Sequence, residues 1–337
     1  MHLPLLLHRA AILDVKKHLP RFLPLESNPG SGSLPPPLAN EGGWGTRSDP
    51  GSLGFAHGRE PDMTKRTYPQ GVPCWVDTEQ PDVEAAARFY AGIFGWTFED
   101  AMPAGASGRY LIAKLDGQDV AGMTSTQEGA AAWNTYVSVE DADAAVQRLV
   151  AAGATVRSAP ADAGEGGRSA ALADPEGAEF RIWQARRRLG AQVANLPGAW
   201  NFSDLHTPNP SAAIAFYEDA FGWQVDDVGF AMMIRRPGYG DHLEATIDPG
   251  IRARQSRLAA PPGFEDAIAW IATTASGKLP HWHVSFTVAD RDQTVVDAKR
   301  LGARVLSQSD TEWTRTALIR DPQGAEFTAS QFTPPSG

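Results

Sequence analysis

Apolar and polar positions alternate in short runs along residues 72–184, and two stretches of helical periodicity interrupt them. The alternating runs predict strands at residues 72–78, 109–115, 118–124, 134–139, 155–158, 168–173 and 179–184. Apolar residues spaced three or four apart predict helices at residues 83–94 and 142–152, each followed by a glycine that can end it. Each half of this segment is therefore expected to fold as a strand, a helix and two or three further strands.

The same order returns in the second half of the chain. Strands are predicted at residues 202–207, 230–235, 268–273, 283–288, 303–307, 315–321 and 326–331, and helices at residues 210–221 and 291–301. Asp-Pro-Glu-Gly-Ala-Glu-Phe at 174–180 recurs as Asp-Pro-Gln-Gly-Ala-Glu-Phe at 321–327, and Phe-Tyr followed by Phe-Gly-Trp occurs at 89–96 and 216–223. Two motifs repeated in one order indicate a duplication. The second copy is about twenty residues longer, which predicts an insertion within residues 237–265.

These patterns divide the chain into four parts: residues 1–65, a domain at 66–186, a linker at 187–197 and a second domain at 198–334. Residues 28–62 are rich in Gly, Pro and Ser, and Met63 follows directly, so the first part is expected to be a disordered tail or an over-extended start. A folded extra module is the alternative. The apolar run at 3–7 is too short to span a bilayer, and no basic segment precedes it, so no signal peptide is expected.

Composition narrows the class of protein. With 42% hydrophobic and 21% charged residues, the 337-residue chain is typical of a soluble globular protein. Its net charge of −10 gives no overall attraction to nucleic acid or to an anionic membrane, so neither is expected as a partner. Cys74 is the single cysteine, which permits no intrachain disulfide and favours the cytoplasm. Its apolar neighbours predict a buried, unreactive thiol.

Phe-Tyr in the first helix, Phe-Gly-Trp after it and Asp-Pro-x-Gly before the last strand resemble the vicinal-oxygen-chelate superfamily, which includes glyoxalase I, bleomycin-resistance proteins and extradiol dioxygenases. The resemblance covers residues 68–333. It implies an α+β fold of two tandem domains, in which four βαβββ units form cup-shaped mixed sheets with helices outside. The concave wall of such a cup holds the ligand. The chain is also similar to a tandem, hydroxylase-like branch, some of whose members accompany aromatic polyketide tailoring.

The resemblance also places the family's metal-binding positions. The first-strand position falls on Trp75 and Phe202, the second-unit strand position on Asn134 and His283, and the glutamate position after Asp-Pro-x-Gly on Arg181 and Thr328. His283 is the one residue of the six that is a competent ligand. A family-type metal is therefore not expected in the first domain, where a fixed guanidinium would repel it.

The first domain contains no histidine between residues 68 and 197. Period-two alternation predicts that six of its side chains point into the cup: Trp75, Asp77, Asn134, Tyr136, Arg181 and Trp183. This set predicts an aromatic-lined pocket with one charged group. The alternative is that they are ordinary strand residues, with both tryptophans in the core.

The second domain is richer in candidate ligands. His281 and His283 share one strand face, and Asp204 and His206 share the face of Phe202. A shifted set of His283, Glu326 and either Asp204 or His206 would resemble a two-histidine, one-carboxylate metal site. Against it, a shift of two residues moves a side chain by roughly 7 Å. No cofactor is therefore predicted, and a divalent metal here is the alternative. Asp204, His206 and His283 are also the candidate acid-base groups.

Three functions remain open from the sequence. The first is a metal-independent protein that binds, and in an enzymatic version modifies, a small aromatic or apolar metabolite. Its predicted contacts in the second cup are Phe202, Asp204, His283 and Thr328. The second is a metal-dependent glyoxalase, lyase or dioxygenase working in the second domain, and the third is a non-enzymatic scaffold with degenerate cups. Because two domains pack within one chain, a monomer or a weak homodimer is expected.

Overall fold

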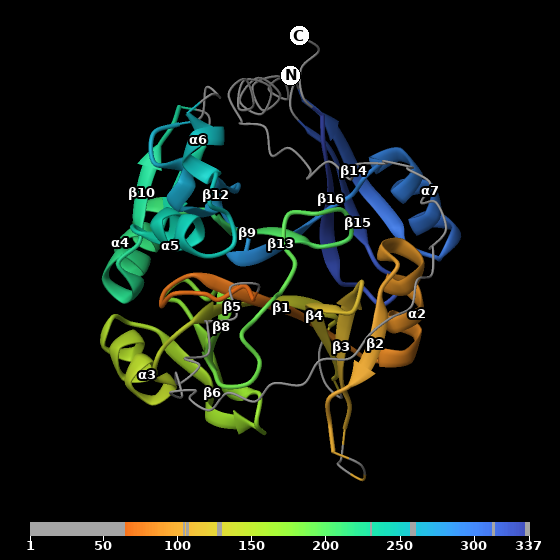
Figure 1. Ribbon diagram of the computed structural model, residues 1–337, viewed down its shortest axis with the longest axis horizontal. Coiled ribbons are helices and arrows are strands. Elements are labelled where there is room, and N and C mark those ends of the chain that lie inside the picture. The colour runs from red at the N-terminus through yellow and green to blue at the C-terminus, as the bar shows by residue number, and fades with distance from the viewer. Residues whose placement is uncertain are drawn as a thin grey trace, which may run out of the picture.

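A computed structural model describes residues 65–333, apart from 104, 106–107, 127–129, 230, 257–260 and 312–313. These residues form two eight-stranded mixed sheets with helices on their outer faces (Figure 1). Residues 1–64 of the tail predicted at 1–65 lie outside the described residues. Among the helices within the described ranges, none is long and apolar enough to cross a bilayer.

The first sheet has the strand order β2-β3-β4-β1-β5-β8-β7-β6. Its domain comprises β1 (Pro73–Gln80), α2 (Val83–Phe94), β2 (Thr97–Asp100), β3 (Tyr110–Leu115), β4 (Gln118–Ser125), β5 (Ala132–Ser138), α3 (Ala142–Ala151), β6 (Thr155–Ala163), β7 (Gly167–Ala173) and β8 (Glu179–Ala185). The central strands β1 and β5 are antiparallel, and each has a parallel outer neighbour, β4 or β8. Two βαβββ units are thus joined edge to edge in one sheet.

The second sheet repeats this order as β10-β11-β12-β9-β13-β16-β15-β14. Its domain comprises β9 (Trp200–Thr207), α4 (Pro210–Phe221), β10 (Gln224–Asp227), β11 (Met232–Arg235), α5 (Tyr239–Ala245), α6 (Ile251–Gln255), the 3₁₀ helix η1 (Phe264–Asp266), β12 (Ala267–Thr273), β13 (His281–Thr287), α7 (Arg291–Arg300), β14 (Arg304–Asp310), β15 (Thr314–Arg320) and β16 (Glu326–Phe332). The predicted α+β fold of two tandem domains and four βαβββ units is confirmed. The exact domain boundaries stay predictions.

Some predicted elements need correction. The four-residue strands β2 and β10 were not predicted, because they lie at sheet edges and most of their side chains are exposed or half-buried, which leaves no clear alternation. The strand predicted at 155–158 extends to Ala163, and the one predicted from 283 already begins at His281. The insertion predicted at 237–265 is present and holds α5, α6 and most of η1.

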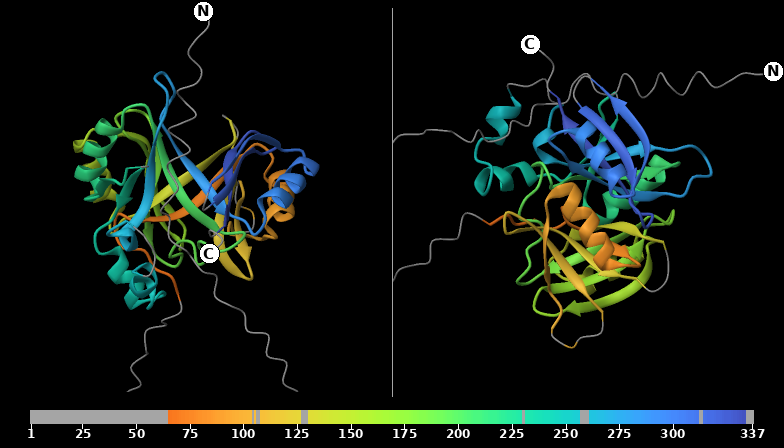
Figure 2. Two further views of the ribbon diagram at one scale, coloured as in Figure 1. Left: turned by 90° about the horizontal axis from the view of Figure 1, so that it is seen from above. Right: turned by 90° about the vertical axis from the view of Figure 1, so that its right-hand side faces the viewer.

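Two apolar cores hold the molecule together, and each crosses the domain boundary. One combines α2 and its strands with β13, β16 and α7, where the rings of Phe94 and Phe286 lie 4.9 Å apart. The other combines α3 and β8 with α4 and its strands, where the rings of Phe180 and Tyr217 lie 5.9 Å apart. Figure 1 accordingly shows α2 beside α7 and α3 beside α4, and Figure 2 shows α2 and α7 side by side from two further sides. Neither domain therefore encloses a core of its own.

The repeated motifs meet across this boundary. The Tyr90 hydroxyl of the first Phe-Tyr donates to Asp321 Oδ2 of the second Asp-Pro-x-Gly at 2.9 Å, and Tyr217 donates to Asp174 Oδ2 at 3.2 Å. Each hydroxyl also accepts an indole N–H, from Trp133 to Tyr90 and from Trp282 to Tyr217. The two motifs are thus halves of one buried contact that joins the domains twice.

The tryptophans of the two Phe-Gly-Trp motifs add a second pair of contacts between the domains. Trp96 Nε1 donates to the carbonyl of Gly198 at 2.7 Å, just before β9. Trp223 Nε1 donates to the carbonyl of Gly71 at 2.6 Å, just before β1. Each indole therefore fixes the start of the other domain's first strand.

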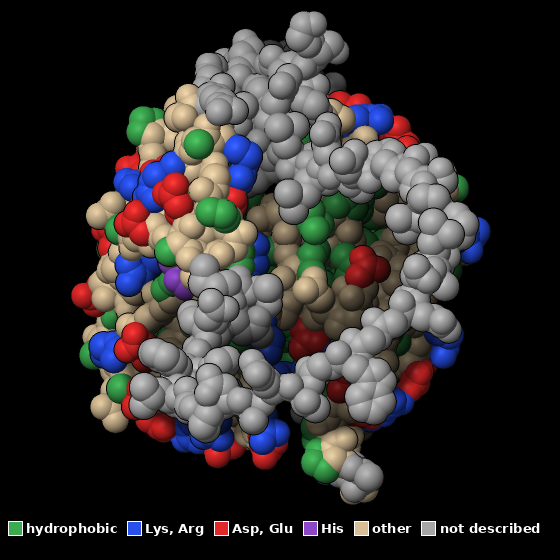
Figure 3. All heavy atoms as spheres, viewed as in Figure 1, with side chains coloured by type: hydrophobic (Ala, Val, Ile, Leu, Met, Phe, Trp, Pro, Cys, Tyr) green, Lys and Arg blue, Asp and Glu red, His purple; other side chains and the backbone are tan. Residues whose placement is uncertain are grey.

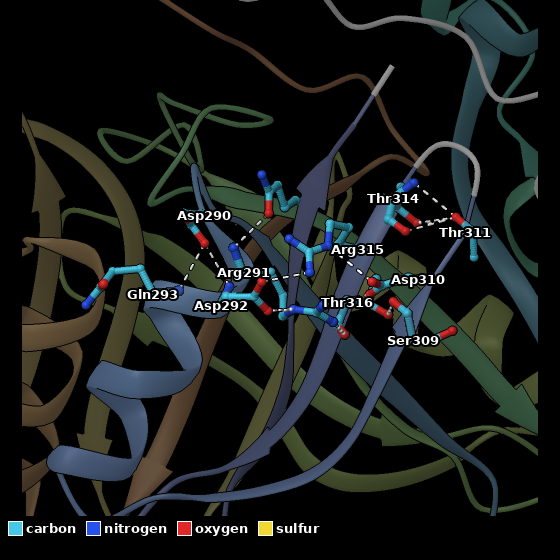
Figure 4. A network of polar contacts seen from close by, with 11 residues as sticks. Asp290, Arg291, Asp292, Gln293, Ser309, Asp310, Thr311, Thr314, Arg315 and Thr316 are labelled. Carbon is cyan, nitrogen blue, oxygen red and sulfur yellow. Dashed lines mark hydrogen bonds and ion pairs between the residues drawn. The ribbon is translucent and has the colours of Figure 1, made fainter. Parts of the chain in front are cut away.

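The last unit has its own polar anchor at the start of α7 (Figure 4). Asp290 caps the helix by accepting from the backbone N–H groups of Asp292 and Gln293. The Arg291 side chain is only 3% exposed. Its guanidinium binds Asp310 at 2.7 Å and donates to the carbonyl of Thr316 at 2.7 Å. These bonds tie the helix to β14 and β15.

Candidate functional site

The first cup is organised around Asp77, a fully buried carboxylate on β1. Strand register places Asn134 of β5 directly opposite it, and the Asn134 amide donates to Asp77 Oδ1 at 3.0 Å. The hydroxyls of Tyr136 and Tyr110 both donate to Oδ2, at 2.5 and 3.0 Å. Trp75 Nε1 donates in turn to the Tyr110 hydroxyl at 3.0 Å. One hydrogen-bonded cluster therefore contains four of the six predicted cup residues: Trp75, Asp77, Asn134 and Tyr136.

Arg181 of β8 supplies the positive charge of this cluster. Its guanidinium lies 3.8 Å from Asp77 Oδ1, donates to the Tyr136 hydroxyl at 3.0 Å and is ion-paired with Glu79. Burial lowers the pKa of Arg181, but the nearby Asp77, Tyr136 and Glu79 raise it by more, so the group is a permanent cation. The sixth predicted residue, Trp183, packs edge-on against Tyr136 with ring centroids 6.4 Å apart.

This arrangement tests the family-type metal in the first domain. The predicted positions hold Asn134 and Arg181, and the β1 residue opposite Asn134 is Asp77 rather than Trp75. A carboxylate is therefore present, but its oxygens are bonded to an amide, two phenols and a guanidinium. A divalent cation would have to displace a fixed positive charge, so these residues do not fit one.

The second cup carries a histidine cluster, defined here as His206, His281 and His283. Register places His281 opposite His206 and His283 opposite Asp204, while Phe202 faces Ser285. The ring of His206 lies 4.9 Å from that of His281 and 5.2 Å from that of His283. The rings of His281 and His283, both on β13, lie 6.4 Å apart. Three imidazoles thus converge where β9 ends and β13 begins.

Burial keeps two of these imidazoles neutral. Burial and the neighbouring His283 and His281 lower the pKa of His206 to about 3, and burial together with His281 lowers the pKa of His283 to about 4. His283 Nε2 is hydrogen-bonded to the Thr328 hydroxyl at 2.8 Å. At neutral pH this wall therefore offers uncharged imidazole nitrogens, which are ligands for transition metals as well as hydrogen-bonding groups.

The alternative metal set of the second domain is brought together only in part. Asp204 and His206 lie beside His283, but Glu326 is ion-paired with Arg320, whose Nε lies 2.9 Å from Glu326 Oε1. Within the described part of the chain, no group of three or more His, Cys, Asp or Glu side chains is arranged to hold a metal. As placed, the imidazoles therefore do not form a metal site. His281 is the exposed member, bonded through Nδ1 to the Leu279 carbonyl.

A separate cavity of about 90 Å³ lies where the insertion meets β9 and β12. We call it the insertion cavity. Five aromatic side chains line it: Tyr68, Trp200, Phe202, Tyr239 and Phe264. Its other walls come from the segment before β1, the linker, α5 and α6. Figure 3 has the viewpoint of Figure 1. It shows a hollow at the centre of the molecule, in which hydrophobic side chains lie beside acidic ones.

Of the residues predicted to contact a ligand, Phe202 alone lines this cavity. Tyr68, Tyr239 and Phe264 were missed because they lie in a pre-strand segment and in the insertion, where no periodicity points to a pocket. Burial raises the pKa of both tyrosines, so both phenols stay protonated. The one signal that could have found Tyr239 and Phe264 was the length and aromatic content of the insertion. Cys74 is fully buried, as predicted.

Comparisons with known proteins agree with this fold. The family model for a glyoxalase-like domain matches residues 75–183 and again residues 202–330. The chain is 34% identical over 280 residues to the "Putative glyoxylase CFP32" of Mycobacterium bovis, covering 81% of this chain and 99% of that protein. It is 34% identical over 285 residues to the anthracycline biosynthesis protein DauV of a Streptomyces species, covering 79% and 94%.

Among solved structures, the 2,3-dioxygenase LapB from Pseudomonas sp. KL28 superposes with a TM-score of 0.50 at 13% identity, covering 78% of this chain and 93% of that one. This is a likeness of fold. The family match falls once on each sheet, and the two named relatives align along nearly their whole length. The chain therefore belongs to the glyoxalase-like domain family, as a tandem protein of the vicinal-oxygen-chelate superfamily.

Proposed function

We propose that this protein binds a small aromatic or otherwise apolar metabolite in the insertion cavity, without the help of a metal. The observation that carries the proposal is the convergence of five aromatic side chains from separate segments on one cavity. Aromatic rings offer large apolar faces and favour stacked or edge-on contact with a planar ligand. In the first cup, by contrast, the polar side chains around Asp77 are bonded to one another rather than directed at a ligand.

The cavity limits the size of that ligand. Its volume of about 90 Å³ is below the roughly 300–1,000 Å³ of drug-sized sites. Phe202 and Arg66 in its wall are only half-buried, so the cavity is open on one side. A single planar ring or head group can therefore enter while the rest of the molecule stays outside. The relative named for anthracycline biosynthesis supports a small-molecule ligand.

The histidine cluster and Asp204 beside it supply the candidate groups for any chemistry on such a ligand. Phe202 lines the cavity, and Asp204 follows two positions later on the same face of β9. We therefore keep Asp204, His206 and His283 as the candidate proton-transfer groups. Because His206 and His283 are neutral at pH 7, they would act there as hydrogen-bond partners or proton acceptors.

A thermal-shift screen with phenol, indole, benzamide and related rings tests the proposal, because a ligand that binds only the folded state raises its stability. Leu243→Phe adds a ring to the cavity wall and should abolish the shift. The control is Leu279→Phe, which adds the same ring at an 84% exposed position and should leave the shift unchanged. A flat response across a broad panel, or equal shifts in both variants, would contradict the proposal.

The convergence of His206, His281 and His283 favours a second candidate, a metal-dependent enzyme in the second domain. These three side chains are its candidate ligands, and the metal would supply Lewis-acid chemistry when bound. Elemental analysis of protein purified without an affinity tag tests this. Less than about a tenth of an equivalent of transition metal would end the idea, since three-histidine sites bind tightly. If neither the ring probes nor a metal bind, the result favours the third hypothesis, a non-enzymatic scaffold with degenerate cups.

A further inference from the structure

Three polar atoms around the insertion cavity are buried and have no hydrogen-bond partner among the residues that the structure describes. They are Arg66 Nε, Asn195 Oδ1 and Gln255 Oε1. They come from the segment before β1, from the linker and from the end of α6, so no single local distortion explains them. Buried polar atoms are almost always paired, because an unpaired one loses its bonds to water and gains none. Their meeting at one cavity indicates a polar guest.

Asn195 is held in place by its backbone. It has a φ of 66°, a left-handed conformation that few residues other than glycine adopt, although asparagine tolerates it. Its N–H donates to the Trp200 carbonyl at 2.9 Å, which closes the turn between linker and β9. The side chain therefore projects from a fixed turn beside the aromatic lining. Strained backbone of this kind is often found at binding sites.

Among the described residues of the wall, the carboxylates are already paired, so a strongly cationic guest would find no free counter-charge. Two carboxylates line the cavity, and both are ion-paired within the protein, Asp248 with Arg254 at 2.6 Å and Glu265 with Arg252 at 3.6 Å. Arg66 is then the charged group whose Nε–H is left to donate. One donor and two acceptors remain for the ligand.

We infer that the insertion cavity recognises the edge of a small cyclic amide or ureide, a planar ring that carries N–H donors and a carbonyl acceptor side by side. The N–H groups would donate to Asn195 Oδ1 and Gln255 Oε1, and the carbonyl would accept from Arg66 Nε. An amide side chain can also present its NH₂ after a half-turn. A ring with donors and acceptors on one edge matches either orientation, and the aromatic side chains cover its faces. The inference rests on the proposed function and names its ligand class.

Uracil, 1,3-dimethyluracil and toluene separate the polar edge from the ring shape. Calorimetric titration of the wild-type protein should give uracil binding at least about tenfold tighter than 1,3-dimethyluracil, whose donors are blocked. Gln255→Leu should weaken uracil about tenfold and leave toluene unchanged, because one acceptor is lost while the rings remain. Asn195→Gly should do the same, because glycine keeps the positive φ. Gln308→Leu, at an exposed position on β14, is the matched control.

The outcomes distinguish the two proposals. If toluene binds but uracil is not preferred over its dimethyl form, the ureide inference fails and the aromatic cavity stands. If uracil affinity is the same in Gln255→Leu, Asn195→Gly and wild type, the inference fails as well. If the three atoms are bonded to ordered waters that no probe displaces in a crystal structure, the cavity is a water site. If no probe binds at all, both proposals fall. Should Gln255→Leu not fold, the wild-type comparison and Asn195→Gly carry the test.

Discussion

Arg181→Met should lower the free energy of unfolding by about 3 kcal/mol, because it removes the cation from a buried network. The methionine keeps an unbranched stem of similar reach but loses the bond to Tyr136 and both ion pairs. Removing one partner of a buried pair costs about 3–5 kcal/mol. We take the lower end because the Arg181 side chain is 22% exposed and Glu79, at 34%, can be hydrated after the change. The Asp77 side chain is 0% exposed, so its carboxylate cannot be hydrated in this way.

Urea unfolding of wild type and variant measures this loss, which corresponds to a fall in Tm of roughly 5 °C for a folded part of this size. The control is Arg187→Met, whose pair with Glu165 is 74% and 73% exposed and should contribute little. Asp77→Asn combined with Arg181→Met should recover part of the loss, since no charge is then left buried. A loss below about 1 kcal/mol in Arg181→Met would refute the reasoning, because the cluster would then be acting as an ordinary surface pair.

Three further predictions follow from the shared cores and the histidine cluster. Tyr90→Phe and Tyr217→Phe should each cost about 1–3 kcal/mol in urea unfolding, because each leaves a buried indole N–H without its acceptor and removes one hydrogen bond to an aspartate of the other domain. Residues 66–186 expressed alone should show no cooperative thermal transition, whereas residues 66–334 should show one, since each core needs both domains. Stability should fall as pH drops from 6.5 towards 4, by roughly 1.4 kcal/mol per pH unit for each of His206 and His283, because the unfolded chain binds protons that the folded one excludes. His206→Gln combined with His283→Gln should flatten that slope.

Local patterns predicted most of the elements, because long amphipathic helices and buried strands impose a clear period on the sequence. The helix at 83–94 has the predicted bounds, and Asp82 caps it by accepting from the backbone N–H of Ala85. The repeated motifs predicted the duplication correctly. What they could not predict is that Tyr90 would bind Asp321 of the other domain rather than an aspartate of its own, because sequence periodicity carries no information on which repeat pairs with which.

The site shows the same limit at the level of register. Alternation assigns Trp75 and Asp77 to one face, but it cannot say which of them meets Asn134, and the register places Asp77 there. A shift of two residues preserves the face and changes the partner, so alternation alone cannot detect it. The insertion cavity is even harder to predict from local sequence patterns. Its walls include Tyr68, Asn195 and Gln255, which are adjacent only after the two domains have packed.

The shared cores stabilise both domains together, so the side chains that line the two cups can differ without loss of the common fold. The first cup places Arg181 against Asp77 and closes on itself, while its domain still supplies Phe180 to the core beneath α4 and Arg66 and Tyr68 to the insertion cavity. The second cup keeps its imidazoles and gains the insertion. A mutation that loosens the first network should therefore weaken binding in the second domain through the common packing, even where it touches none of the cavity walls. Arg181 lines no part of the cavity, so Arg181→Met should lower stability and, through the common packing, probe affinity. Leu243→Phe should instead abolish binding by filling the cavity, and it should also lower stability because Leu243 is buried in the shared core.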